Sequence, residues 1–402
     1  MLNKRNLKIA TTELYREKGN CILKKIRIVQ LIHGIHFGGA EKIVYQICTR
    51  INRERFHPVC VILADGYLRK KLIEEGIETH LIPMRSKLDF TVISRIVKVL
   101  KQYKPTIIHC HTSRTNLIGR ICSKLAKVKN VTTIHSPIEK DTNITLQFKP
   151  INAFIEKLSR PMLDMYVTVS KNVYDQFINE GFDKNKITYV PNGVEIEIAP
   201  ISEEEKNRLS GELNIKNNIV VAMVSQLRPR KGCEYFIKAM PGIISKCKDV
   251  KFLIVGDAEF VEGRDYLGDL KKMTEDLKIA DKVIFTGFRE DVPKIMQLID
   301  ILVLPSLFGE GLPLTLLEGM ANNIPIVATN TEGNNEVVID GFNGFLVPHR
   351  NERAITEKIC QLIDDKEMRI QMGKNGRKRV EEMFSINQMI RKYEEVYEGL
   401  IK

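Results

Sequence analysis

Short apolar runs that alternate with helix-like segments are the feature of this 402-residue sequence that most limits its fold. The runs at 26–32, 219–224 and 301–305 have the length and the β-branched content of buried strands. Segments whose apolar residues repeat at helical spacing, such as 40–51, lie between runs of this kind. Because the alternation occurs in both halves of the chain, we predict an α/β fold with two facing, doubly wound, Rossmann-like domains.

The predicted domains follow from where this alternation stops and restarts. A basic, polar arm at 1–23 precedes a first domain at 24–200, and the polar segment at 201–218 is expected to be a linker. A second domain at 219–382 and a final helix at 383–402 complete the chain. The helical spacing of its apolar residues is weak. The arm is therefore expected to be either disordered or a membrane-facing helix, and the sequence does not decide between the two.

The charge distribution narrows the class of partner. Residues 1–200 hold 33 Lys and Arg against 18 Asp and Glu, a net charge of +15, whereas residues 201–402 hold 29 against 32, a net charge of −3. A basic half of this kind favours an anionic partner such as a membrane surface or a lipid phosphate, and solubility alone is the alternative. Nucleic acid is disfavoured, because aromatic residues are not interleaved with the basic ones.

The cysteines and the apolar runs indicate a compartment. None of the eight cysteines forms a C-x-x-C pair, and Cys48, Cys60 and Cys110 lie in apolar segments, so we expect reduced core residues. The sequence shows neither an apolar run long enough to cross a membrane nor the apolar region of a signal peptide. We therefore expect a cytoplasmic protein that can attach peripherally to the inner face of the cell membrane.

The stretch at 306–313 is the clearest candidate for a binding loop. Gly309, Gly311 and Pro313 follow a buried strand and force a turn into a helix, with Pro313 expected at the first helical position. The free N–H groups and the positive dipole end of such a helix attract an anion, and phosphate fits best.

Two carboxylates accompany this loop. Glu310 lies within it, and Glu318 lies in the second turn of the helix among leucines. A carboxylate in so apolar a setting needs a partner, and sugar or ribose hydroxyls would provide one. A helix cap with a surface glutamate is the alternative interpretation.

A second glycine loop follows the first predicted strand. Gly38 and Gly39 lie between that strand and a helix, where backbone N–H groups can approach an anion closely. Glu41 in the same loop can equally be a first-turn carboxylate that interacts with the helix dipole. In the second half of the chain, Arg228 and Lys231 follow the strand at 219–224 and could neutralise a diphosphate, although a basic surface turn is the alternative.

Histidines end two of the predicted strands. His109 and His111 flank Cys110, but strand alternation places both histidines on one face and the cysteine on the other, with no carboxylate to complete a metal site. His135 ends the next strand, at the sheet edge where open α/β folds bind ligands. It is a candidate site residue, although a lone histidine is more often structural.

Together these motifs resemble family 4 of the retaining glycosyltransferases, the group 1 enzymes with the GT-B fold. The resemblance extends from about residue 26 to 384. The matching motifs are Glu310 and Glu318 for the Glu-x7-Glu signature, Gly38-Gly39-Ala40-Glu41, Thr133-Ile134-His135, Lys231-Gly232, 324–329, Glu336 and 341–347. The family's usual arginine five residues before the lysine is Gln226 here, and Arg228 could substitute for it.

The resemblance implies a sugar transfer from a nucleotide-diphospho-sugar, with a UDP-sugar favoured as donor. A lipid-linked or polysaccharide acceptor is implied, as in the synthesis of capsule, lipopolysaccharide or other cell-envelope glycans. The first domain would then hold the acceptor and the second the nucleotide, while the last helix crosses back to the first domain. No Asp-x-Asp occurs, so we expect no metal and no cofactor.

The resemblance also implies residue roles. His135, Glu310 and Lys231 would be catalytic, with His135 close to the anomeric carbon. The residues that would bind the donor are Gly38, Gly39, Arg228, Lys231, Arg289, Glu310, Gly311, Leu312 and Glu318, with Glu318 on the ribose hydroxyls. Two alternatives remain, a nucleotide-sugar epimerase on the same fold and a non-catalytic protein that binds sugars or nucleotides.

Overall fold

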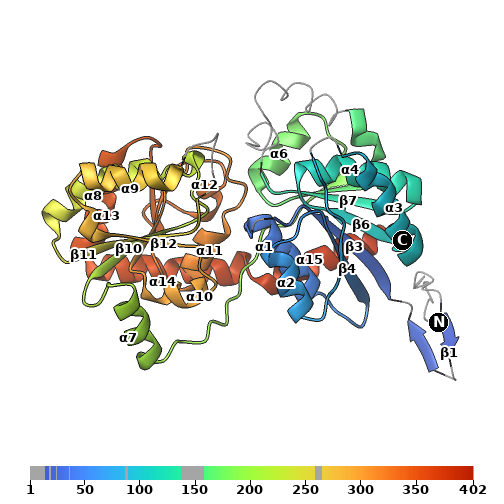
Figure 1. Cartoon of the computed structure of the whole chain (residues 1–402), viewed down its shortest axis with the longest axis horizontal. Helices are drawn as coiled ribbons and strands as arrows, with labels where there is room; N and C mark the ends of the chain where they lie inside the picture. Colours follow the sequence, from blue (N-terminus) through green and yellow to red (C-terminus); the bar gives the residue numbers. More distant parts are fainter. Residues whose placement is uncertain are drawn as a thin grey trace, which may run out of the picture.

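The structure is a computed structural model that describes residues 14–17, 20–23, 25–35, 37–86, 89–136, 158–258 and 265–401. Two α/β domains lie side by side, and the chain passes between them twice (Figure 1). Of the predicted N-terminal arm, residues 1–13 lie outside the described residues. Its described part is not helical, because β1 (Leu14–Glu17) and β2 (Asn20–Leu23) pair as an antiparallel sheet.

The N-terminal domain is built on a parallel sheet with the strand order β5-β4-β3-β6-β7-β8-β9. Its strands are β3 (Ile26–Ile32), β4 (Phe56–Ile62), β5 (Glu78–Leu81), β6 (Ile107–Cys110), β7 (Lys129–Ile134), β8 (Met165–Thr168) and β9 (Ile187–Tyr189). Its helices include α1 (Gly39–Arg50), α2 (Tyr67–Glu74), α3 (Thr91–Tyr103), α4 (Ser113–Ala126) and α6 (Lys171–Asn179), with short 3-10 turns at η3 (Arg160–Met162) and η4 (Lys184–Lys186).

The C-terminal domain has a second parallel sheet, with the order β12-β11-β10-β13-β14-β15. Its strands are β10 (Ile219–Val224), β11 (Val250–Val255), β12 (Val283–Gly287), β13 (Ile301–Leu304), β14 (Ile326–Thr329) and β15 (Gly344–Val347). Its helices include α8 (Cys233–Lys246), α9 (Tyr266–Asp276), α10 (Val292–Ile295), α11 (Leu314–Ala321), α12 (Asn334–Val337), α13 (Glu352–Asp364) and α14 (Lys366–Met383), with 3-10 turns at η5 (Pro229–Lys231), η6 (Ala280–Lys282) and η7 (Met296–Leu298).

The strand order of each sheet reverses near its centre, which determines where a ligand can bind. The reversal lies between β3 and β6 in the first sheet and between β10 and β13 in the second. At such a point the loops after the two central strands run in opposite directions and leave a crevice at their carboxyl ends. The predicted glycine loops and the basic loop follow three of these four strands, so the fold places them at the two crevices.

Two predicted boundaries differ from the structure. The segment at 201–218, expected to be a linker, contains helix α7 (Glu203–Glu212), and its buried Leu209 and Leu213 belong to the hydrophobic core (Figure 1). The last helix, α15 (Ile386–Gly399), begins later than residue 383, because Met383 still ends α14 and Ser385 caps the new helix.

Helix α15 docks on the N-terminal domain, as the GT-B resemblance implied. It carries Tyr393 and Tyr397, both fully buried, and the ring of Tyr397 meets that of Phe56 edge-on at 6.1 Å. Within the described parts of the chain, no helix has the length and apolar character needed to cross a membrane. Cys48, Cys60 and Cys110 are buried and free, as expected.

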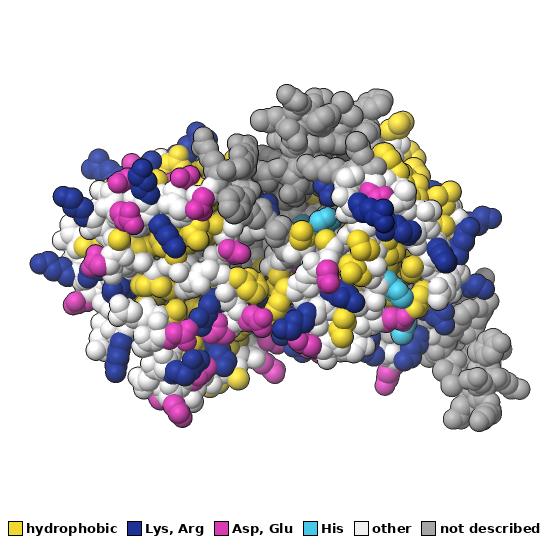
Figure 2. Space-filling model, in the orientation of Figure 1, with side chains coloured by type: hydrophobic (Ala, Val, Ile, Leu, Met, Phe, Trp, Pro, Cys, Tyr) yellow, Lys and Arg dark blue, Asp and Glu magenta, His cyan; other side chains and the backbone are white. Residues whose placement is uncertain are grey.

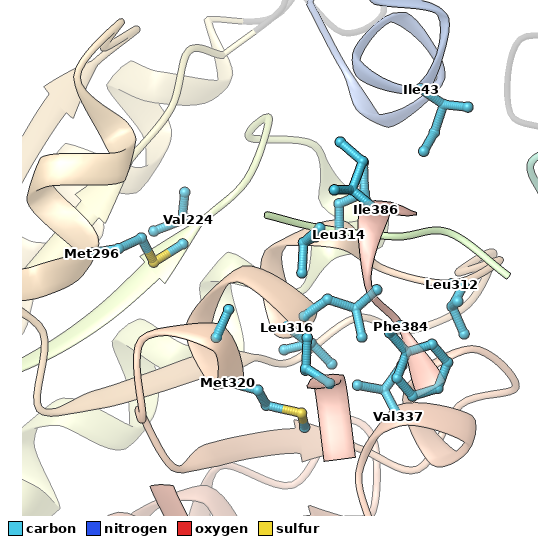
Figure 3. Close-up of a cluster of buried hydrophobic side chains, with 14 of the residues drawn as sticks. Ile43, Val224, Met296, Leu312, Leu314, Leu316, Met320, Val337, Phe384 and Ile386 are labelled. Carbon is cyan, nitrogen blue, oxygen red and sulfur yellow. The ribbon is translucent and has the colours of Figure 1, made fainter. Parts of the chain in front are cut away.

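The hydrophobic core beneath the 306–313 loop reaches across the domain junction (Figure 3). Side chains of α11 pack toward Phe384 and Ile386, which lead into α15, and Ile43 of α1 approaches from the other domain. Pro313 precedes α11 in an extended conformation and does not occupy its first helical position. The loop is therefore anchored on the segments that connect the two domains.

Candidate active site

The loop after β13 packs directly against the N-terminal domain. Gly309 has φ +77, a conformation that suits glycine. A Cβ atom at Gly311 would lie 2.0 Å from the carbonyl oxygen of His135, so only glycine permits this contact. The side-chain amide of Asn192, in the segment between the domains, donates to the carbonyl oxygen of Leu312 at 2.8 Å. This loop thus carries Gly311 directly against the end of β7.

Glu310 and Lys231 form a buried ion pair at the ends of β13 and β10. Lys231 Nζ lies 2.6 Å from Glu310 Oε1, which also accepts from Ser306 Oγ at 2.5 Å. Arg230 Nη1 is 3.8 Å from the same oxygen. Adjacent central strands bring these residues together although they are about eighty positions apart in the sequence.

The electrostatics of this pair favour an ionised carboxylate. Burial would raise the pKa of Glu310, but the positive charges of Lys231 and Arg230 outweigh it and hold that pKa below its ordinary value. Burial lowers the pKa of Lys231, and the nearby Arg230 and Arg228 add to the effect, while Glu310 opposes it. The result is a dense group of positive charge with one embedded carboxylate, which is suited to binding a diphosphate.

Glu318 faces the other domain. It forms an ion pair with Lys42 of α1, and the two side chains are 19% and 32% exposed. Sequence reasoning did not identify Lys42, although it directly follows the Gly38-Gly39-Ala40-Glu41 loop. The pair uses Oε1 of Glu318, and Oε2 has no hydrogen-bond partner among the described residues.

The first glycine loop opens α1 and meets the helix that carries Glu318. Gly38 caps α1, and its N–H donates to Glu41 Oε2 at 3.2 Å, so Glu41 does stabilise its own helix start. A Cβ at Gly39 would touch Leu314 of α11 at 3.8 Å. Burial raises the pKa of Glu41, and the positive charge of Arg228 opposes that shift from the other domain.

His135 lies at the end of β7 on the N-terminal side of the junction. Its Nε2 is 3.3 Å from Nδ1 of His111, and burial lowers the pKa of His135 to about 4. His109 and His111 share one face of β6, as predicted, with their rings 4.0 Å apart, while Cys110 contacts Asn130 on the opposite side. Both histidines are hydrogen-bonded to protein side chains.

Arg289 stands apart from this group. Its guanidinium donates to Asp291 at 2.7 Å and to Glu212 of α7 at 2.5 Å, and these bonds raise its pKa. The adjacent Phe288 meets Tyr67 of the N-terminal domain edge-on at 5.4 Å. Arg289 therefore lies near the domain junction, but its carboxylate partners belong to its own domain.

Glu336 makes an interdomain contact that sequence reasoning did not assign. From α12 its carboxylate accepts from the N–H groups of Lys171 at 2.7 Å and Asn172 at 2.8 Å, and from the hydroxyl of Ser170. It thereby caps helix α6 of the opposite domain. The sequence signals were its position in a polar loop after β14 and its match to one of the family's motifs.

Comparisons with known proteins agree with this arrangement. Residues 37–198 match the model of Glycosyltransferase Family 4, and residues 205–379 match that of Glycosyl transferases group 1. The chain is 28% identical over 390 residues to an Escherichia coli UDP-Gal:alpha-D-GlcNAc-diphosphoundecaprenol alpha-1,3-galactosyltransferase, covering 94% of this chain and 97% of that protein. It is 26% identical over 369 residues to the capsular polysaccharide biosynthesis glycosyltransferase CapM of Staphylococcus aureus, covering 87% and 92%.

Solved structures show the same fold. Anabaena HepE in complex with UDP and glucose superposes with a TM-score of 0.83 at 23% identity, over 93% of this chain and 100% of that one. Sucrose-phosphate synthase from Thermosynechococcus elongatus superposes with a TM-score of 0.78 at 18% identity, over 94% and 99%. At these identities the likeness establishes the GT-B fold alone.

Proposed function

Because the chain belongs to the group 1 glycosyltransferases, with an N-terminal domain of family 4, we propose that it transfers a sugar from a UDP-sugar with retention of configuration. The acceptor is a lipid-linked or polysaccharide intermediate of cell-envelope glycan synthesis. The Escherichia coli relative is named for a UDP-galactose donor and a diphosphoundecaprenol-linked acceptor, which supports this donor and acceptor class. The Staphylococcus aureus relative is named for capsular polysaccharide biosynthesis, which supports the kind of glycan. One observation carries the proposal: the Lys231–Glu310 pair adjoins Gly311, whose loop lies against the end of the strand that bears His135.

Charge on the C-terminal side stabilises the leaving diphosphate. Lys231 and Arg228 supply positive charge, and the backbone N–H groups of Gly311 and Leu312, in the loop that leads into α11, add to it. This arrangement takes the place of a metal ion, so we propose a metal-independent reaction. Arg289 borders the nucleotide base and is held in place by Asp291.

Hydroxyl groups of the donor bind the two carboxylates of the Glu-x7-Glu signature. Glu318 accepts from the ribose hydroxyls through Oε2 while Lys42 retains Oε1. Glu310 contacts the donor sugar, and His135 contacts the sugar or the acceptor near the anomeric carbon. Gly38 and Gly39 let the first loop approach the donor phosphates and the acceptor.

The basic N-terminal domain contacts an anionic membrane surface that carries the acceptor. Figure 2 shows Lys and Arg side chains beside hydrophobic ones over the region of α3 and α4. Phe90 and Leu125 are 71% and 57% exposed there. The exposed lysines of these helices and their ends are Lys98, Lys101, Lys104, Lys124 and Lys127. Each lysine near an anionic surface contributes about 1 kcal/mol, which salt reduces.

Flotation with liposomes tests this surface. The double variant Lys98→Glu/Lys101→Glu should float less with anionic vesicles at low salt than wild type. Lys271→Glu/Lys272→Glu, which removes exposed lysines from the C-terminal domain, is the matched control and should float normally. Equal flotation of wild type with neutral and anionic vesicles would refute attachment through an anionic surface.

Product analysis tests the transfer reaction. The protein is incubated with UDP-glucose, UDP-galactose or UDP-N-acetylglucosamine and with diphosphoundecaprenol-linked sugars, and UDP release and product configuration are measured. We expect UDP release that depends on acceptor and an α-linked product. An epimerase would convert the UDP-sugar without acceptor, and a binding protein would release no UDP.

A further inference from the structure

A buried chain of polar side chains lies behind His135 and connects it to the last helix. Its members come from three neighbouring strands and from α15, and all are at most 1% exposed. They are Gln30, His109, His111, Thr133, Tyr393 and Tyr397. Buried polar groups are costly unless their hydrogen bonds are satisfied, so the direction of each bond in this chain is constrained. The proposed function assigns a role to His135 but to none of these six side chains.

Gln30 of β3 lies at the centre of the chain and presents its two carboxamide ends to different partners. Its Nε2 donates to the hydroxyl of Tyr397 at 3.1 Å. Its Oε1 lies 2.6 Å from Nε2 of His111. A carboxamide oxygen can only accept, so the hydrogen of this bond belongs to His111 Nε2.

The position of the hydrogen on His111 determines which atom donates in its hydrogen bond with His135. Burial holds the pKa of His111 well below its ordinary value, so at neutral pH the ring has a single N–H. With that hydrogen on Nε2, Nδ1 of His111 can only accept. His135 Nε2, 3.3 Å away, must therefore be the donor. His135 is also neutral at this pH, which leaves a lone pair on its Nδ1.

The other branch of the chain holds Gln30 in its orientation. The hydroxyl of Tyr397 is 2.7 Å from His109 Nδ1, and His109 Nε2 is 2.7 Å from Thr133 Oγ1. When Tyr397 directs its hydrogen toward His109, it offers Gln30 a lone pair, which the amide nitrogen fills. Helix α15 thus contributes to the hydrogen-bond polarity at the other end of the chain.

We propose that Gln30 and His111 are positioning residues that hold His135 in the tautomer with hydrogen on Nε2, so that Nδ1 is a hydrogen-bond acceptor. This inference rests on the proposed function, in which His135 contacts the donor sugar or the acceptor. In this tautomer Nδ1 of His135 accepts the hydrogen of a substrate hydroxyl and so orients the oxygen of that hydroxyl. In the other tautomer Nδ1 would carry hydrogen and would donate to the hydroxyl oxygen instead.

Nitrogen-15 NMR of the full-length protein labelled at histidine tests the tautomer directly, because the two ring nitrogens shift according to which carries hydrogen. His135→Asn identifies the His135 signals. Wild type should show His135 with hydrogen on Nε2. Gln30→Met, which keeps the length and removes both hydrogen-bonding ends, should lose this single tautomer. Gln30→Glu keeps an acceptor for His111 and should restore it.

Two results would overturn the proposal: hydrogen on Nδ1 of His135 in wild type, or an unchanged tautomer in Gln30→Met with wild-type circular dichroism. If Gln30→Met does not fold, Tyr397→Phe, which removes only the hydroxyl that orients Gln30, replaces it with the same expected result. Gln46→Met, a buried glutamine of α1 outside the chain, is the matched control and should leave the tautomer unchanged.

Turnover of whichever UDP-sugar proves active in the product analysis separates this inference from the proposed function. Gln30→Met should lower kcat about 10- to 100-fold, as loss of an orienting partner does, while the donor KM stays near wild type. Gln30→Glu should recover most of that rate. Wild-type turnover in His135→Ala would refute the proposed role of His135 in the reaction. The NMR measurement would still test separately whether Gln30 and His111 determine the tautomer of His135.

Discussion

The two sides of the domain junction bury polar groups in opposite ways. On the C-terminal side the groups are charged and paired, with Glu310 against Lys231 at 2.6 Å. On the N-terminal side they are neutral, and burial keeps the pKa of His111 and His135 low. A low-dielectric interior penalises an unpaired charge and an unsatisfied polar atom alike. The first side therefore depends on charge balance, and the second on which atoms carry hydrogen.

This difference matches the parts of the proposed substrate. A diphosphate gains negative charge as it leaves, and fixed positive groups such as Lys231 stabilise that change. Sugar hydroxyls stay neutral and require directed donors and acceptors, which a chain of neutral imidazoles provides. The contrast predicts that acid, charge removal and hydrogen-bond removal affect the two sides differently.

The largest expected effect is the response of stability to mild acid. The pKa of His135 is about 4 in the folded protein, and His109 and His111 are also lowered by burial, against an ordinary value near 6.5. Below about pH 6.5 these histidines bind more protons in the unfolded chain than in the folded chain. The free energy of unfolding therefore falls as the pH drops below about 6.5. Each imidazole contributes up to about 1.4 kcal/mol per pH unit to this dependence of the free energy of unfolding on pH.

Urea unfolding between pH 7 and pH 5 measures this slope. His135→Asn should reduce this slope by about the share of one imidazole. The Glu310 side should contribute nothing in this window, because its pKa lies below the ordinary 4.5 and its stabilisation is lost only in stronger acid. A slope in His135→Asn equal to that of wild type would remove the distinction between the two sides.

The second prediction concerns His135 in turnover. His135→Ala should lower kcat by roughly 10²–10⁴-fold, the range for a positioned group near the reacting centre, with little change in donor affinity. Steady-state rates beside calorimetric donor titration measure both quantities. Turnover within about threefold of wild type would make His135 a structural residue.

The third prediction concerns charge balance. Lys231→Met leaves the carboxylate of Glu310, which is 5% exposed, without its closest cation, and should cost about 3–5 kcal/mol in the free energy of unfolding. The double variant Lys231→Met/Glu310→Gln removes both charges and should recover most of that stability. It should not recover activity, because the diphosphate loses its lysine. Equal stability of the single and double variants would show that Arg230 alone balances Glu310.

The sequence predicted the parts of the site that local chemistry determines. Strand–loop–helix alternation gave two doubly wound domains, and glycines placed the loops at 38–39 and 309–311 at strand ends, where the structure has them. The shared face of His109 and His111 followed from strand alternation. Pro313 and the segment at 201–218 differed, because tertiary packing determined the exact helix boundaries.

The contacts across the junction could not be predicted in the same way. Lys42 and Glu318 are 276 positions apart, and Ser170 and Glu336 are 166 apart. Their pairing depends on how one domain sits on the other, which no local pattern encodes. For the same reason the role of Gln30 was not visible, since an apolar strand with one glutamine does not show which helix returns to meet it.

The fourth prediction divides the two carboxylates of the signature. Glu318→Gln should raise the donor dissociation constant roughly 10- to 150-fold, the cost of about 1.5–3 kcal/mol for a charge-assisted hydrogen bond, and leave folding nearly intact. Glu310→Gln should lower turnover more than affinity, because its contacts strengthen as charge develops at the anomeric carbon. Calorimetry beside steady-state rates checks both, and wild-type donor binding by both variants would place the donor elsewhere.

The smallest expected effect concerns Glu336, which holds the two sides together. Its carboxylate accepts from two backbone N–H groups at the start of α6, Lys171 at 2.7 Å and Asn172 at 2.8 Å. Glu336→Gln keeps one acceptor oxygen and removes the charge that favours a helix N-terminus. We therefore expect a loss of about 1 kcal/mol in the free energy of unfolding, in the range of a helix cap. Glu352→Gln, an exposed first-turn residue of α13 within one domain, is the matched control and should lose less. Urea unfolding compares the two variants.

Because Glu336 caps a helix of the opposite domain, hydrogen exchange should rise at the first N–H groups of α6 in Glu336→Gln and stay unchanged in Glu352→Gln. Wild-type exchange in α6 would show that this contact does not hold the two sides together.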